Sequence, residues 1–223
     1  MNGRRPASIL FDLDGTLVDS APGVEFSIRE AFGTCKLPLA KANLRELIGP
    51  PIRTILSQAG NVNEESSLDR LERAFRASYD GEGWRKTLCF PGADLVVRRM
   101  HELEHRLFVV SNKPRQVSLQ ILETAGILEY FEAIVTRDSR SPHYRGKQEM
   151  IGALMAQRSI GCECLMVGDT MEDAKAAASA GIKFIWMTHG YGSVSQLSSI
   201  PVAHALDRFS QFLPLITKES LCD

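Results

Sequence analysis

The chain has 223 residues, 44% hydrophobic and 24% charged, and its 26 basic and 27 acidic side chains give a net charge of −1. This balance excludes intrinsic disorder, and it lacks the basic excess that binding a nucleic acid polymer requires. The length suits one large domain, or one domain with a small insertion. Five irregularly spaced cysteines indicate no disulfide framework, and no apolar stretch has the length of a signal peptide or a membrane span. We therefore expect a cytoplasmic protein without membrane contact.

The first predicted element is a buried strand at residues 8–13, which leads into a polar segment. Asp12 and Asp14 lie two residues apart and are followed by Gly15 and Thr16. Residues two apart share a face of an extended chain, so both carboxylates are expected to point the same way. Two like charges side by side are costly unless a cation lies between them. A simple Asp-Gly turn is the structural alternative.

Residues 19–85 show helical periods only. Apolar side chains recur at helical spacing in four stretches, residues 24–32, 44–48, 52–56 and 68–78. An all-helical block directly after the first strand predicts an inserted bundle. We therefore expect a core made of residues 1–18 and 86–223, and a small helical domain at residues 19–85.

Beyond the insertion, short apolar strands alternate with helical patterns. Strands are expected at residues 106–110, 133–135, 164–167 and 183–187, and helices around residues 96–103, 117–125, 150–158, 170–180 and 209–216. Such alternation predicts an α/β fold, in which helices cover both faces of a Rossmann-like, doubly wound parallel sheet.

In open α/β sheets, ligands bind outside the carboxyl ends of the strands. Ser111, Asn112 and Lys113 follow one predicted strand, and Asp169 follows another, with Asp173 four residues later. Clustered carboxylates suit Mg²⁺. One carboxylate can attack phosphorus as a nucleophile while a second protonates the leaving oxygen. The strand ends therefore predict a phosphoryl-transfer site whose charge a metal and a lysine neutralise.

Three motifs in this order resemble those of the haloacid dehalogenase superfamily, namely Asp12-Leu13-Asp14-Gly15-Thr16, Ser111-Asn112-Lys113 and the segment 168–173. The helical insertion is similar to the C1 cap of the subfamily that includes phosphoglycolate phosphatases, and so are the segments 48–53 and 189–192. The resemblance implies a Mg²⁺-dependent phosphatase that hydrolyses a small phosphomonoester through an aspartyl-phosphate intermediate, with the cap closing over the site.

The resemblance also implies a role for each motif residue. Asp12 is the nucleophile and Asp14 the general acid and base. The residues expected to hold the phosphoryl group or the substrate are Ser111, Asn112, Gly15, Thr16 and Arg53, and the expected Mg²⁺ ligands are Asp12, Asp14, Asp169 and Asp173. The third motif departs from the family, because no proline follows its lysine. We assign that lysine to Lys147, which opens a helix, and keep Arg145 and Lys113 as alternatives.

Several of these residues have a simpler interpretation. Asp173 could cap a helix together with Thr170, and Ser111 could cap the helix that begins near residue 114. Lys147 and Arg53 could be solvated side chains at helix starts. His189 is expected to be an ordinary loop residue.

Alternatives also remain at the level of function. A phosphomutase would share Asp12 and Asp14, whereas a dehalogenase of the same superfamily lacks the second aspartate. A binding protein on the same scaffold is a third alternative. Phosphoglycolate, sugar phosphates and nucleoside monophosphates are all candidate substrates, and the sequence carries no signal of the oligomeric state.

Overall fold

The computed structural model describes residues 6–158, 160, 163–193 and 200–217. The chain divides into two compact units, one made of residues 1–18 and 89–223 and the other of residues 19–88. We call them the α/β unit and the helical unit. The sequence-based division set the second boundary after residue 85, ahead of a short strand at residues 88–89.

A six-stranded parallel sheet forms the centre of the α/β unit. Its strand order is β5-β4-β1-β6-β7-β8, and every neighbouring pair is parallel. The strands are β1 (Ser8–Phe11), β4 (Arg106–Ser111), β5 (Ala133–Thr136), β6 (Cys164–Gly168), β7 (Lys183–Met187) and β8 (His204–Leu206). The order runs outward from β1 in both directions, so the predicted doubly wound sheet is confirmed. The short edge strand β8 was not predicted.

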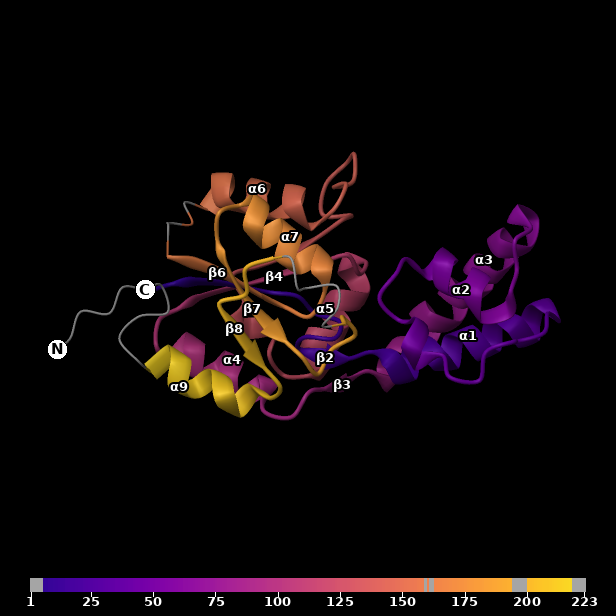
Figure 1. Cartoon of the computed structure of the whole chain (residues 1–223), viewed down its shortest axis with the longest axis horizontal. Coiled ribbons are helices and arrows are strands. Elements are labelled where there is room, and N and C mark those ends of the chain that lie inside the picture. Colours follow the sequence, from indigo (N-terminus) through magenta and orange to yellow (C-terminus); the bar gives the residue numbers. More distant parts are fainter. Residues whose placement is uncertain (1–5, 159, 161–162, 194–199, 218–223) are drawn as a thin grey trace. The chain divides into compact units, whose positions relative to one another are not determined.

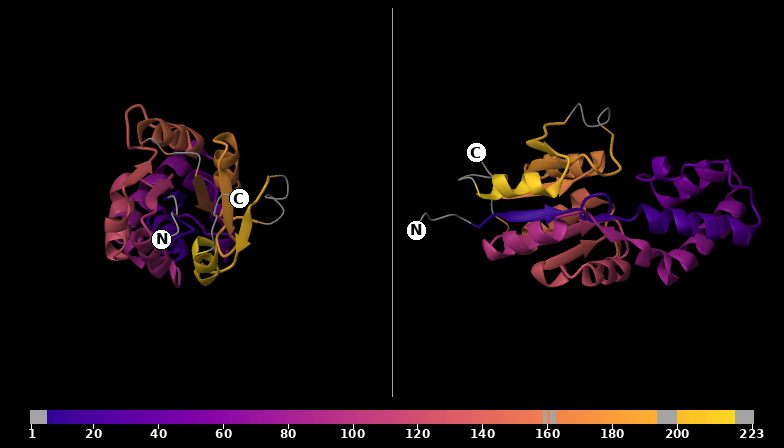
Figure 2. Two further views of the ribbon diagram at one scale, coloured as in Figure 1. Left: turned by 90° about the vertical axis from the view of Figure 1, so that its left-hand side faces the viewer. Right: turned by 90° about the horizontal axis from the view of Figure 1, so that it is seen from below.

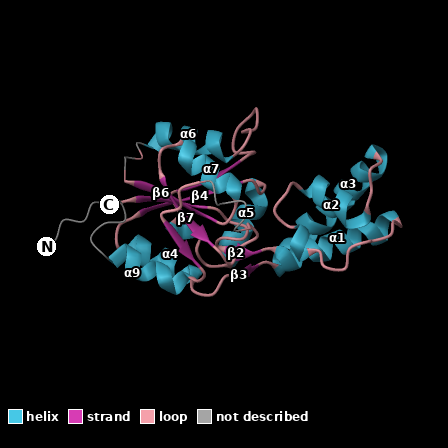
Figure 3. Ribbon diagram, in the orientation of Figure 1, coloured by secondary structure: helices cyan, strands magenta, loops and turns pink. Residues whose placement is uncertain are grey.

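Helices cover both faces of this sheet. They are α4 (Ala93–Glu102), α5 (Arg115–Thr124), α6 (Lys147–Arg158), α7 (Met171–Ser179) and α9 (Phe212–Thr217), with short 3₁₀ turns at Leu128–Tyr130 and Phe209–Gln211. Helices α6 and α7 pack together over one face, and α4 and α9 lie together against the other (Figures 1 and 2). Figure 3 shows the strands as the middle layer of this arrangement.

The core of the α/β unit follows the two-residue period of its strands. Leu10, Phe108 and Met166 come from three adjacent strands and share one buried cluster with Met150 of α6 and Ala174 of α7. On the other face, the ring of Phe11 lies edge-on to Phe131 and tilted against Phe212 of α9. Apolar side chains therefore fix the sheet from both sides and leave the strand ends for polar residues.

The helical unit contains the three helices α1 (Ala21–Cys35), α2 (Ile52–Gly60) and α3 (Glu65–Gly81), and 3₁₀ turns at Arg45–Leu47 and Gly83–Lys86. The strands β2 (Val18–Asp19) and β3 (Leu88–Cys89) form a separate two-stranded sheet where the chain passes between the units. The helix expected at residues 44–48 is only a 3₁₀ turn. Ile48 is already extended, and the Gly-Pro-Pro segment that follows disfavours helical backbone.

Three further findings bear on the expectations from sequence. The first strand ends at residue 11 instead of 13, because the carbonyl of Leu13 accepts the N–H groups of Leu17 and Val18 and the chain turns back. Cys35 and Cys89 are free thiols, while the cysteines at positions 162 and 222 lie outside the described residues. None of the described helices combines the length and the apolar character that a membrane crossing requires.

Candidate active site

The carboxyl ends of three adjacent strands bring the predicted motifs together. Asp12 follows β1, Ser111 is the last residue of β4, and Asp169 follows β6. The strands are in register, since Phe11 pairs with Val109 on one side and Val167 on the other. The parallel pairing thus places residues separated by some 150 positions in the chain at one edge of the sheet.

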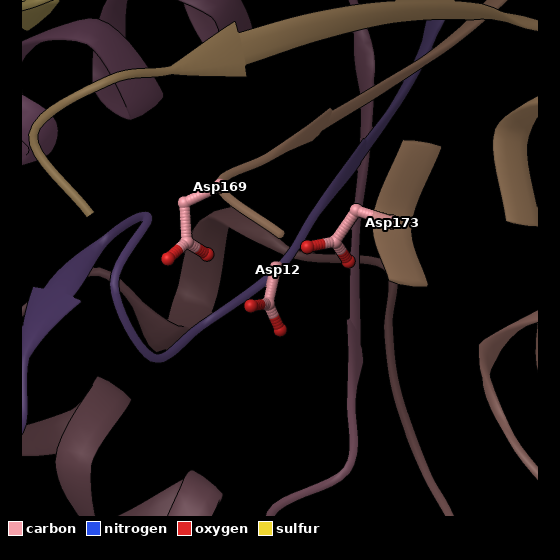
Figure 4. Close-up of side chains that lie close together, drawn as sticks. All are labelled: Asp12, Asp169 and Asp173. Atoms are coloured by element: carbon pink, nitrogen blue, oxygen red, sulfur yellow. The ribbon is translucent and has the colours of Figure 1, made fainter. Parts of the chain in front are cut away.

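Three carboxylates gather at this edge (Figure 4). Asp12, Asp169 and Asp173 each offer an oxygen atom, and these atoms all lie within 4.8 Å of one another. All three residues are buried, with Asp169 and Asp173 fully so. We call this group the aspartate cluster. The cluster contains three of the four predicted Mg²⁺ ligands.

Lys147, the first residue of α6, reaches into the aspartate cluster. Its Nζ lies 2.7 Å from Oδ1 of Asp12 and 2.6 Å from Oδ1 of Asp173, and the side chain is 4% exposed. Lys147 is therefore not a solvated lysine at a helix start. Arg145 is exposed instead. Of the three candidate cations, Lys147 is the one that touches the expected nucleophile.

The electrostatics of the aspartate cluster fit a divalent cation. Burial raises the pKa of Asp12 well above its ordinary value, although Lys147 opposes this. Burial and the charge of Asp173 raise the pKa of Asp169 to about 7. Three ionised carboxylates against one ammonium group leave an excess of two negative charges, which one divalent cation cancels. An all-oxygen donor set suits Mg²⁺.

Burial alone would lower the pKa of Lys147, but the carboxylates of Asp12 and Asp173 outweigh it and raise that pKa above its ordinary value. The ammonium form therefore persists throughout the pH range in which proteins remain folded. Lys147 thus supplies a permanent positive charge beside the expected nucleophile.

Asp173 has a structural role in addition to its place in the cluster. Its Oδ2 accepts hydrogen bonds from the backbone N–H of Thr170 at 3.0 Å and from the Thr170 hydroxyl at 2.6 Å, which completes a capping box at the start of α7. Its Oδ1 contacts Lys147. The capping interpretation is therefore correct, and it leaves the second oxygen facing the site.

Asp14 contacts a different lysine from the one that contacts Asp12. Its two carboxylate oxygens lie 2.9 and 3.1 Å from Nζ of Lys113. Gly15 follows with a φ of +81°, and its N–H donates to the carbonyl of Val18. The early turn after β1 thus directs the Asp14 side chain to a second lysine, outside the aspartate cluster.

Thr16 and the loop after β7 both contact Asp169. The Thr16 hydroxyl donates to Oδ1 of Asp169 at 3.2 Å, and the backbone N–H of Tyr191 donates to Oδ2 at 2.7 Å. Thr16 is fully buried. In the structure, then, this predicted phosphate-binding hydroxyl has a carboxylate partner.

Ser111 and Asn112 end β4 at the same edge of the sheet. The Ser111 hydroxyl accepts the backbone N–H of Lys113 at 3.2 Å. Ser111 is thus not the cap of α5, whose first N–H donates to the carboxylate of Asp138. The exposed side-chain amide of Asn112 donates to Glu172 at 2.8 Å.

Arg53, which was predicted to contact the substrate, lies in α2 of the helical unit. Its guanidinium pairs with Glu65, with Asp69 at 2.7 Å and with Glu72 at 3.3 Å. The side chain is 34% exposed. In the structure, therefore, its partners are carboxylates of its own unit.

Sequence reasoning missed two contributors to the site. Glu172 accepts the Asn112 amide and also lies 3.4 Å from the backbone nitrogen of Lys147, so it joins two of the motif segments. The N–H of Tyr191 contacts Asp169 through the backbone, and its side-chain identity gives no signal of that contact. The glycines on either side of Tyr191 were the available signal, but the segment 189–192 was identified only as similar to the family, and these glycines were assigned no role at the site.

Comparisons with known proteins agree with this geometry. The sequence matches the family model described as haloacid dehalogenase-like hydrolase over residues 9–187. A phosphoglycolate phosphatase of Cereibacter sphaeroides is 32% identical over 191 residues, with 82% of this chain and 85% of that protein covered. The tyrosine-protein kinase PtkA of Mycobacterium tuberculosis is 30% identical over 207 residues, with 91% of this chain and 70% of that protein covered.

A solved structure of a haloacid dehalogenase-like family hydrolase from Streptococcus pneumoniae has the same fold. Its TM-score is 0.84 at 21% identity, and the superposition covers 95% of this chain and 99% of that one.

Proposed function

The chain belongs to the haloacid dehalogenase-like hydrolase family, and on this premise we propose that it is a Mg²⁺-dependent phosphatase that acts on a small phosphomonoester through an aspartyl-phosphate intermediate. The predicted family and enzyme class, a hydrolase of the phosphatase kind, are confirmed by the family match and the phosphatase relatives. The metal, the intermediate, the site residues and the substrate are what we propose.

The contact between Lys147 and Asp12 is the observation that carries this proposal. Burial raises the pKa of Asp12, but the buried ammonium group of Lys147 beside it opposes this effect and favours the ionised carboxylate that a nucleophile requires. Asp12, Asp169 and Asp173 would hold Mg²⁺. Bound Mg²⁺ would supply positive charge that screens the phosphoryl oxygens from these carboxylates. The place of Asp14 in the metal site stays a prediction.

In the first proposed step, an oxygen of Asp12 attacks phosphorus. A bond forms between this oxygen and phosphorus, the ester bond from phosphorus to the leaving oxygen breaks, and Asp14 donates a proton to that oxygen. The pairing with Lys113 fixes the Asp14 carboxyl group in one orientation. Ser111, Asn112 and the segment Gly15-Thr16 are proposed to hold the phosphoryl group.

In the second step, Asp14 removes a proton from a water molecule as the water oxygen attacks phosphorus. The bond between phosphorus and Asp12 breaks, which releases inorganic phosphate and restores the free carboxylate. Lys147 stabilises the carboxylate as it is regenerated, because its Nζ contacts the same side chain.

The substrate is proposed by class. The phosphoglycolate phosphatase relatives make phosphoglycolate the first candidate, followed by sugar phosphates and nucleoside monophosphates. We propose that the helical unit is a cap that contributes to substrate selection, with Arg53 as a candidate contact. The free thiols of Cys35 and Cys89 are consistent with a reducing, cytoplasmic compartment.

The similarity to PtkA supports a second candidate, phosphoryl transfer to a protein tyrosine. Both candidates share a phosphoryl group that must be bound and neutralised at the site. Assays with a panel of phosphorylated metabolites and with ATP plus a tyrosine peptide, each with Mg²⁺ and with EDTA, would separate the two.

Asp12→Asn tests the nucleophile. The variant should keep the fold, because an amide occupies nearly the same volume, and lose at least about a thousandfold in hydrolysis of p-nitrophenyl phosphate. Trapping of phosphate on the unmodified protein but not on the variant would identify the intermediate. Full activity in Asp12→Asn would overturn the assignment, and activity unaffected by EDTA would favour a dehalogenase-like, metal-free chemistry.

A further inference from the structure

Strand β7 and the loop that follows it both donate hydrogen bonds to Asp169. The backbone N–H of Tyr191 donates to its Oδ2, and the indole of Trp186 donates to its main-chain carbonyl at 3.2 Å. The Thr16 hydroxyl occupies Oδ1. The position of Asp169 is therefore set by β7 and its loop on one side, and by the turn after β1 on the other.

Two glycines make this approach possible. A Cβ atom added at Gly190 would overlap the side chain of Asp169, and one added at Gly192 would overlap its main-chain carbonyl. Any larger residue at either position must push the loop or Asp169 aside. The sequence Gly-Tyr-Gly thus allows the loop backbone to pack closely against the side chain and the main chain of Asp169.

His189 ties the same loop to the turn after β1. Its Nε2 lies 3.1 Å from the carbonyl oxygen of Thr16, and its Nδ1 lies 3.3 Å from that of Asp207. The ring also packs against Phe90, with the ring centres 4.1 Å apart. A neutral imidazole carries one N–H, so either tautomer donates to one of the two carbonyls. With the proton on Nε2, the histidine ties the loop to the segment that contains Thr16.

We infer that residues 189–192 form a positioning element that holds the Asp169 carboxylate in place to bind a divalent cation. The inference rests on the proposed function, in which Asp169 is a metal ligand. Each carboxylate oxygen can accept more than one contact, so both remain available to a cation. Hydrogen bonds to a ligating carboxylate orient it, and their loss typically weakens metal binding by about tenfold or more.

Two variants test this element, and one glycine serves as a control. Gly190→Ala forces Asp169 to move, and His189→Ala removes the tie to Thr16. Gly152→Ala adds the same methyl group in α6, where no atom lies within 4 Å. Isothermal titration with MgCl₂ measures the affinity for Mg²⁺. The unfolding temperature is measured on EDTA-treated protein, and hydrolysis of p-nitrophenyl phosphate is used to determine kcat and KM.

We expect Gly190→Ala to bind Mg²⁺ at least about tenfold more weakly, and His189→Ala at least about threefold. Gly152→Ala should bind as the unmodified protein does. Raising the Mg²⁺ concentration should restore much of kcat in His189→Ala, which a merely structural defect would not allow. If Gly190→Ala fails to fold, the Mg²⁺ affinity of His189→Ala is the test of the inference.

Folded variants with unchanged Mg²⁺ affinity would overturn the inference and leave the proposed function standing. Failure of the unmodified protein to bind Mg²⁺ would overturn the proposed metal dependence, and the inference with it.

Discussion

Lys147 and Arg53 are each surrounded by carboxylates, but the two clusters differ in burial. Lys147 is 4% exposed, and its partners Asp12 and Asp173 are 5% and 0% exposed. Arg53 is 34% exposed, and its partners Glu65 and Asp69 are 81% and 62% exposed. The same kinds of charges therefore meet in the interior of the α/β unit and at the surface of the helical unit.

The difference decides what each cluster can do. Water screens the surface cluster, so its ion pairs contribute little free energy to folding. In the buried cluster the charges cannot be screened, and each group depends on the others for compensation. Burial raises the pKa of Asp12 and would lower that of Lys147, but the carboxylates of Asp12 and Asp173 outweigh burial and raise the pKa of the lysine. For this reason we propose the buried cluster, and not the surface cluster, as the functional site.

Removing the lysine charge should give the largest effect. Lys147→Met keeps a long apolar stem but leaves Asp12 and Asp173 buried without their cation. Breaking one partner of a buried pair costs about 3–5 kcal/mol, so the free energy of unfolding should fall by about that amount. Hydrolysis of p-nitrophenyl phosphate should be lost. Urea unfolding and steady-state kinetics measure the two effects.

Arg53→Met is the matched variant in the surface cluster. It should lower the free energy of unfolding far less than Lys147→Met, because the exposed carboxylates it leaves are hydrated. Equal losses in the two variants would contradict the contrast between the clusters. A change in KM across the substrate panel, without a change in kcat, would support Arg53 as a substrate contact.

Metal removal should give the next largest effect, and it should depend on pH. The pKa of Asp169 is raised to about 7 in the fold, so the protonated form is favoured by folding. Its contribution to stability is full below the unfolded pKa of about 4 and is lost as the pH rises through about 7. EDTA-treated protein should therefore be less stable at about pH 8 than at about pH 5.5.

Added Mg²⁺ should reverse that loss, because a cation favours the ionised carboxylates. The rise in unfolding temperature on adding MgCl₂ should thus be larger at the higher pH, as differential scanning calorimetry can measure. Asp169→Asn should abolish most of the difference between the two pH values. An equal Mg²⁺ effect at both would contradict the buried-charge account.

Much of this fold was predictable because parallel strands buried on both faces are short and apolar, as at residues 8–11 and 164–168. The alternation of strands and helices predicted a parallel sheet with helices on both faces, but not the strand order. The 3₁₀ turn at residues 45–47 was not predictable from apolar spacing, since three apolar residues fit a helix or a turn equally well. The edge strand β8 contains a single buried residue and gave no pattern.

At the site, three of the four carboxylates that were predicted to meet form the aspartate cluster, and Asp14 lies outside it. Lys147 was the lysine assigned from sequence, but the pairing of Lys113 with Asp14 was not predicted. Lys147 and Lys113 are both near the motifs in sequence, and only the turn after β1 separates their partners into Asp12 and Asp14. The hydrogen bond from the backbone N–H of Tyr191 to Asp169 could not be predicted from sequence for a different reason. Every residue except proline carries a backbone N–H, so the residue type does not reveal the contact. Tertiary geometry, not residue type, carries this information.

A substitution at Asp138 should give the smallest effect on stability. This residue also shows that an exposed carboxylate can have a shifted pKa. It is an exposed carboxylate, yet it accepts the backbone N–H of Arg115 at the start of α5 and the hydroxyl of Thr136 at 2.7 Å. Burial would raise its pKa, but these donors outweigh burial and lower it.

Asp138→Ala should lower the free energy of unfolding by about 1 kcal/mol, as the loss of a helix cap does, and leave kcat and KM unchanged. Asp138→Asn keeps an acceptor and should recover most of the stability. The deficit of the alanine variant should shrink as the pH falls through the lowered pKa, because protonation weakens the same bonds in the unmodified protein. A deficit that is constant down to pH 2, or one that the asparagine variant shares in full, would show that the carboxylate contributes through something other than its bonds to the backbone.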